Sequence, residues 1–156
     1  LTVKSESRMS ATALSRPART SRWLITIATV VYGLIPPLVD LSQTHVFHPD
    51  WTPHARLHAV WQLCTNSGLA LLALYLMWFK GDYDLRRIRI AGLIGLLVYG
   101  GFFVSALTHP LFGGGLGAEQ SGVSTLMSLY GNVIVFTPML VLVIIGLWLS
   151  GRGVAD

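Results

Sequence analysis

The sequence has little charge and only one cysteine. Of its 156 residues, 11 are Lys or Arg and 7 are Asp or Glu, whereas 53% are hydrophobic. So little polar surface cannot cover a soluble globule, and the apolar residues also fall into long blocks. Cys64 is alone, which excludes an intramolecular disulfide and a Cys-x-x-Cys thiol-exchange enzyme. The composition indicates a polytopic membrane protein.

Four apolar blocks reach the roughly 20 residues that a helix needs to cross a bilayer. They predict helices over about residues 23–41, 57–79, 88–108 and 126–149. Because the connections leave no room for a soluble domain, we predict an all-α integral membrane protein with one four-helix transmembrane domain over residues 23–150. Residues 1–22 are predicted to form a mobile basic tail, and residues 151–156 a short C-terminal tail.

Positive charge is concentrated on one side of this predicted bundle. Lys and Arg precede the first helix, fill the second connection and follow the fourth helix, at Lys4, Arg8, Arg16, Arg19, Arg22, Lys80, Arg86, Arg87, Arg89 and Arg152. Because positively charged loops stay in the cytoplasm, both termini are predicted to be cytoplasmic. The membrane is expected to be the plasma (inner) membrane if the protein is bacterial. Topology and contact with anionic lipid explain the charge, so no nucleic-acid partner is expected.

Four of the five histidines lie within residues 44–58, in the connection predicted to be non-cytoplasmic. Histidine side chains titrate, bind metals and relay protons near neutral pH, so this connection is the natural place for chemistry. The four are His45, His48, His54 and His58. His109, at the end of the predicted third helix, lies on the same side of the membrane.

The second helix is predicted to begin at Pro53, ahead of its apolar block, because Thr52 suits an N-cap and proline suits the first helical position. Polar residues follow at intervals of four, at His54, His58, Gln62 and Asn66. This stripe is predicted to face the bundle interior, since lipid offers it no hydrogen-bond partners. Its expected partners include Asp40, Ser105, His109 and Asn132. Trp61 is the tryptophan expected to line an inner pocket.

Three carboxylates can join this layer. Asp40 ends the first helix after two adjacent prolines, where we expect a kink or an unwound turn. Asp50 lies in the histidine segment, and Glu119 lies in a glycine-rich loop that could form a flap. With the five histidines they make a sufficient ligand set for Zn, Fe or Cu. The plainer interpretation of Asp40 is an ion pair with Arg56.

Several sharper motifs do not match. The zincin pattern requires Glu directly after its first histidine, but Ala55 follows His54. Membrane desaturases carry more histidines, on the cytoplasmic side. Haem ligation by His58 and His109 is conceivable, but nothing in the sequence selects that pair. The glycine-rich loop lacks the Gly-Lys-Ser/Thr ending of a phosphate loop.

The stretch Thr44-His45-Val46-Phe47-His48-Pro49-Asp50-Trp51, followed by His54-Ala55-Arg56-Leu57-His58-Ala59-Val60-Trp61-Gln62, resembles a signature of small, uncharacterised four-helix membrane proteins. That resemblance implies a membrane location and a single domain, with no catalytic assignment. A looser likeness links the chain to the emopamil-binding, sterol-isomerase-like group. Its helical bundles use His and acidic residues in a membrane pocket.

Two hypotheses remain open. In the first, the protein is an enzyme for a lipid-like or other hydrophobic small molecule, acting through a metal or through His/Asp acid–base chemistry. Its candidate catalytic residues are His54, His58, His109, Asp40 and Asp50, and its pocket residues are Trp61, Gln62, Asn66 and Glu119. In the second, it is a non-catalytic metal-binding protein, a carrier or an accessory subunit of a membrane complex. Either could form a homo-oligomer.

Overall fold

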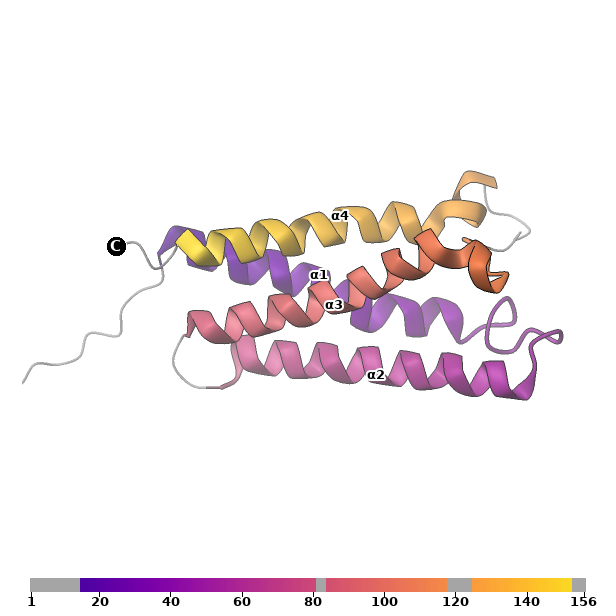
Figure 1. The fold of residues 1–156 in the computed structure, drawn as a ribbon. Coiled ribbons are helices and arrows are strands. Elements are labelled where there is room, and N and C mark those ends of the chain that lie inside the picture. The colour runs from indigo at the N-terminus through magenta and orange to yellow at the C-terminus, as the bar shows by residue number, and fades with distance from the viewer. Residues whose placement is uncertain (1–14, 81–83, 118–124, 153–156) are drawn as a thin grey trace, which may run out of the picture.

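The computed structural model describes residues 15–80, 84–117 and 125–152, which form one bundle of four long helices (Figure 1). The helices are α1 (Arg16–Asp40), α2 (Pro53–Trp78), α3 (Leu85–Thr108) and α4 (Thr125–Arg152), and a short 3₁₀ helix, η1 (His109–Phe112), follows α3. All four long helices are long and apolar enough to cross a membrane. No strand occurs in the described ranges. The predicted all-α fold with four such helices is confirmed.

The first helix begins at Arg16, seven residues before the predicted start at Trp23. Pro17 lies in its first turn, where proline is favoured. Ala18 and Ser21 are buried, and the Ser21 hydroxyl donates a 2.6 Å hydrogen bond to the Gly146 carbonyl of α4. Residues 16–22 are therefore a packed turn of α1. The prediction that they belong to a mobile tail was wrong. The basic composition of this segment gave no sign that Ala18 and Ser21 are buried in the bundle.

The same helix continues through Pro36 and Pro37 to Asp40, where we expected it to kink or unwind. Pro37 has no backbone N–H, so the Gly33 carbonyl loses its usual helical donor. The Ser67 hydroxyl of α2 donates to that carbonyl instead, at 2.8 Å. A side chain from the neighbouring helix thus satisfies the group that proline leaves free, as membrane helices commonly require.

Most of the buried side chains lie in the half of the bundle that holds the two ends of the described chain. Buried residues of this half include Ile25, Tyr32, Ala73, Tyr99 and Val143. Added Cβ atoms at two helix glycines would meet a neighbouring helix, Gly92 against Leu147 at 2.6 Å and Gly146 against Ile25 at 2.7 Å. These glycines therefore let the helices approach closely.

The other half of the bundle, which we call the open half, comprises residues 33–40, 53–62, 100–108 and 125–142. None of these residues is buried, and α3 diverges from α2 toward this end (Figure 1). No neighbouring helix comes within 4 Å of a Cβ atom added at Gly100 or Gly101. The connection over residues 41–52, which carries His45 and His48, lies at this end. The open half therefore has room for a site.

Candidate functional site

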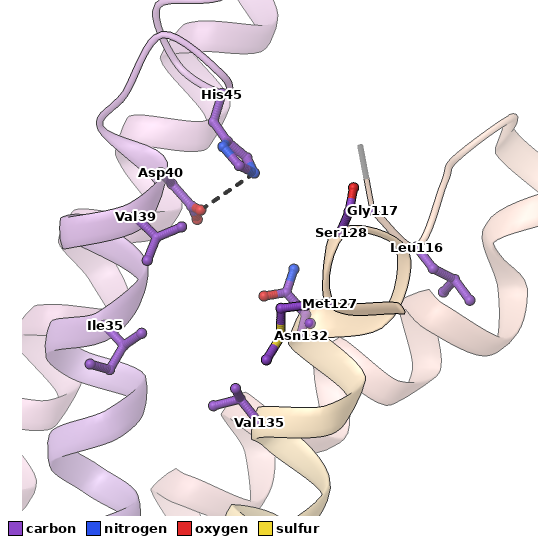
Figure 2. A pocket seen from close by; sticks show the side chains of 11 residues that line it. Ile35, Val39, Asp40, His45, Leu116, Gly117, Met127, Ser128, Asn132 and Val135 are labelled. Atoms are coloured by element: carbon purple, nitrogen blue, oxygen red, sulfur yellow. Dashed lines mark ion pairs between the residues drawn. The ribbon is translucent and has the colours of Figure 1, made fainter. Parts of the chain in front are cut away.

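Two cavities lie in the open half, and the larger one extends toward the packed half as far as Tyr32, Asn66 and Leu97. The larger, about 540 Å³, is lined by all four helices and by the connection after α1. The smaller, about 290 Å³, lies between α1 and α4 (Figure 2). Small-molecule sites commonly measure about 300–1,000 Å³, so the larger cavity can hold a ligand of that class.

The larger cavity has an apolar wall with a few polar groups at different depths. Its aromatic residues are Tyr32, Trp51, Phe102 and Phe136. Its polar residues are Gln62 and Asn66 of α2, Ser105 of α3, Asn132 of α4, and Asp40 and His45. The Tyr32 hydroxyl is buried and has no hydrogen-bond partner among the described residues. A mostly apolar cavity with a few polar groups is what a hydrophobic ligand with a polar end requires.

Asp40 and His45 lie where the two cavities meet, because both residues line both cavities. His45 Nε2 is 3.8 Å from Asp40 Oδ1, and Figure 2 shows the pair facing the α4 side of the smaller cavity, where Asn132 lies. Asn132 also lines both cavities. The junction thus combines an ionisable pair with a carboxamide.

The connection after α1 folds back to bring His45 to Asp40. The Val46 amide donates to the Asp40 carbonyl at 3.0 Å, and the Val46 side chain is buried. The ring of His45 is held on the edge away from Asp40, where Nδ1 shares a 2.9 Å hydrogen bond with the Thr44 hydroxyl. The Thr44 hydroxyl in turn contacts the Ser42 hydroxyl at 2.9 Å. The two hydroxyls therefore hold one edge of the His45 ring while its other edge faces Asp40 at 3.8 Å.

The predicted polar stripe of α2 is divided between two surfaces. Gln62 and Asn66 line the larger cavity, whereas His54 and His58 are exposed and do not line it. Each step of four residues turns the helix by about 40° beyond a full circle, so His54 and Asn66 differ by about 120°. The deeper residues face inward and the shallower ones outward, and the two histidines contact each other, Nε2 to Nε2, at 3.0 Å.

The other predicted histidines and tryptophan also lie outside the cavities. His48 is 3.8 Å from Asp50 in the connection; His48 is half-buried and Asp50 is exposed. His109 Nδ1 lies 2.8 Å from the Ala106 carbonyl at the start of η1. Trp61 is 64% exposed and stacks on His58, so it does not line the pocket as we had predicted. Glu119 lies outside the described residues.

Asp40 and Arg56 do not form the ion pair considered from the sequence, because each has another partner. Asp40 pairs with His45, while Arg56 Nη2 donates a 2.9 Å hydrogen bond to the His48 carbonyl. That bond ties the histidine connection to the first turns of α2. Asp40 therefore lines the cavity and does not form an ion pair with Arg56.

The expected metal layer is not assembled. Within residues 15–80, 84–117 and 125–152, no three His, Cys, Asp or Glu side chains converge closely enough to hold a metal ion. The histidines lie on separate surfaces, in the connection, on the outside of α2 and at η1. Spacing along the chain brought them to one end of the bundle, but the helix rotation and the loop path separated them.

Sequence reasoning did not single out Trp51, Tyr32, Phe102 and Phe136 as cavity residues. Trp51 shared the interfacial position of the other tryptophans, which indicated an anchor. The aromatic residues of the helices sit in apolar blocks with no polar neighbour to mark an inner face. A polar residue within the fourth block, Asn132, was the available signal for its inner side.

Comparison with known proteins gives no match to a curated protein or to a solved structure. A family model matches residues 24–155, which include the whole of α2, α3 and α4 and all of α1 from Leu24 onward. The resemblance to an uncharacterised family is thereby confirmed. The chain belongs to DUF6640, a family of unknown function.

Proposed function

We propose that the protein is an integral membrane protein with both termini in the cytoplasm and the histidine connection on the opposite side. Four helices of sufficient length and apolarity support insertion. The bundle brings the two ends of the described chain together at one end, where Arg16, Arg89 and Arg152 also lie (Figure 1). This charge distribution is typical of a cytoplasmic side.

We further propose that the open half binds a lipid-like or other hydrophobic small molecule. The single observation that carries this proposal is the cavity of about 540 Å³, whose apolar wall bears carboxamides from α2 and α4. The polar end of the ligand would lie near Asp40, which favours a neutral or cationic group over a phosphate, because like charges repel at short range. The smaller cavity, between α1 and α4, offers a route toward the side of the bundle.

The activity we propose is proton transfer to or from that ligand, with Asp40 and His45 as the acid–base pair. Their 3.8 Å separation lets one group stabilise the charge that develops on the other. Thr44 fixes the orientation of the His45 ring through Nδ1. The earlier candidates His54, His58 and Asp50 do not line the cavity, so they take no part in this proposed chemistry.

A carrier or accessory subunit is the second candidate. Gln62, Asn66 and Asn132 can bind a ligand by hydrogen bonds without exchanging protons, which is sufficient for binding alone. In that case Asp40 and His45 would serve recognition.

Mass spectrometry of small molecules that co-purify with the protein tests these proposals. We expect Asn66→Leu to lose the bound molecule by at least several-fold, because the cavity wall loses the Asn66 amide. Thr65→Val is the matched control, since Thr65 neighbours Asn66 on the same helix but is exposed outside the cavity. A bound molecule that is equally abundant in Asn66→Leu, or absent from the native protein, would overturn the binding proposal.

Asp40→Asn distinguishes an enzyme from a carrier. An enzyme variant that binds but cannot transfer a proton should carry a different, unconverted molecule from the one found in the native protein. A carrier should carry the same molecule in both.

A further inference from the structure

The outward face of α2 presents a pair of histidines that the cavity does not use. His54 and His58 are four residues apart, both are exposed, and their Nε2 atoms are 3.0 Å apart. The rings are close to perpendicular, with centroids 4.5 Å apart and an interplanar angle of 86°. Both nitrogens therefore point to the same place on the helix surface, outside the bundle.

We propose that His54 and His58 form a two-histidine chelating site for a divalent transition-metal ion, separate from the cavity. Histidines at i and i+4 on one helix face are a recurrent pair of metal ligands. Without the ion, one Nε2 must carry the proton that the two nitrogens share. When the ion binds, that proton moves to Nδ1 or to solvent, and both Nε2 lone pairs point at the metal.

The distance between the two nitrogens is compatible with chelation. Metal–nitrogen bonds of roughly 2.0–2.1 Å place two ligands about 2.9 Å apart at right angles and about 3.3 Å apart at the tetrahedral angle. The 3.0 Å hydrogen bond of the ion-free pair therefore already holds the two nitrogens close to the separation that a bound ion needs. Among divalent first-row ions, Ni²⁺ and above all Cu²⁺ bind imidazole ligands most tightly. The site should therefore favour Cu²⁺ or Ni²⁺, with water as the remaining ligands.

Two neighbouring features favour such a site. The pair lies in the first two turns of α2, within about 8 Å of Pro53 along the helix axis, so water at the bundle end can reach it. Trp61 stacks on His58, with ring centroids 5.9 Å apart, and restrains that ring. A bound paramagnetic ion at this position would also quench the Trp61 fluorescence.

The test is titration of the full chain, purified without a polyhistidine tag, with Cu²⁺ and Ni²⁺. We expect one ion per chain by calorimetry, and Cu²⁺ electron paramagnetic resonance that shows two imidazole nitrogens. His54→Ala and His58→Ala should each weaken binding about tenfold or more, the scale of loss seen when a metal site loses even a supporting group. One imidazole nitrogen should remain in the spectrum.

Two controls separate this site from the other histidines. His45→Ala and His48→Ala should bind as the native chain does. The double variant His58→Ala with Val60→His keeps five histidines but places the second ring on another face, so it should bind as weakly as His58→Ala alone. Stoichiometric binding that survives in His54→Ala and His58→Ala, or no stoichiometric binding by the native chain, would overturn the proposal. Because Asn66→Leu leaves the histidine pair intact, failure of the cavity proposal and failure of this one are distinguishable.

Discussion

Gly33 is involved both in the backbone hydrogen bonding of α1 and in its packing against α2. Its carbonyl lacks a helical donor because of Pro37, and it accepts from Ser67 of α2. Its missing side chain also makes room for α2, since an added Cβ would overlap the Cβ of Ala70. The close approach of the two helices is what brings Ser67 within hydrogen-bond distance. The hydrogen bond to the free carbonyl and the close packing of α1 on α2 therefore depend on the same glycine.

We predict that Gly33→Ala destabilises the protein by about 1–3 kcal/mol, the usual cost of forcing extra volume into a packed contact. Both overlapping atoms are Cβ atoms, so neither can rotate away. The measurement is the midpoint of thermal unfolding in detergent. Gly68→Ala is the matched control on α2, because its added Cβ has no atom within 4 Å. Equal midpoints for the two variants would contradict the predicted contact.

At the scale of the helix, local chemistry sets where α2 begins, and packing sets which way it faces. Thr52 accepts a 3.2 Å hydrogen bond from the Ala55 amide, and Pro53 is the first helical residue, as predicted. Which residues face inward depends on the rotation of the helix about its axis. Gln62 and Asn66 line the cavity because Leu63 and Ala70 are the buried residues of α2 nearest to them.

Thr52→Ala is predicted to cost about 1 kcal/mol, because the Ala55 amide loses its capping acceptor. The loss should appear first as fraying of the turn that carries His54, so hydrogen exchange at the amides of residues 54–56 should accelerate. Thr52→Ser keeps the hydroxyl and should exchange at the native rate. If Thr52→Ala also leaves these amides protected, the cap does not hold the helix start.

At the scale of the whole molecule, the bundle combines a close-packed half with an open one. The packed half contains Ile25, Tyr99 and Val143 and is fastened by the Ser21 hydrogen bond to α4. Near its end, Arg89 donates to the Ser150 carbonyl at 2.8 Å, which joins α3 to α4. A rigid half of this kind can hold the open half in place while a ligand enters or leaves it.

The lone cysteine makes the proposed topology easy to test. In a Cys64→Ser background, a cysteine at Ser42 should react with a membrane-impermeant maleimide from the non-cytoplasmic side. A cysteine that replaces Arg19 should react only after the membrane is permeabilised, because positive residues mark the cytoplasmic end. The opposite labelling pattern would reverse the orientation, and labelling of both sites in sealed vesicles of one orientation would contradict a membrane-spanning bundle.

Local and compositional properties of the sequence were sufficient for much of this description. The number of helices long and apolar enough to cross a membrane follows from block length and apolarity, and the start of α2 follows from Thr52 and Pro53. The start of α1 at Arg16 did not follow, because its buried face is defined by α4 and its composition is that of a basic tail.

Whether residues at one end of the bundle actually meet was decided only by the tertiary structure. All five histidines lie at the end predicted for them, but His45 alone reaches the cavity, because Val46 anchors its loop against Asp40. His54 and His58 turn outward, since four-residue spacing drifts around a helix. Hydrophobicity and capping are properties of neighbouring residues, which a sequence contains. The rotation of a helix and the path of a loop depend on contacts between residues that are distant in the sequence. Only the folded bundle defines those contacts.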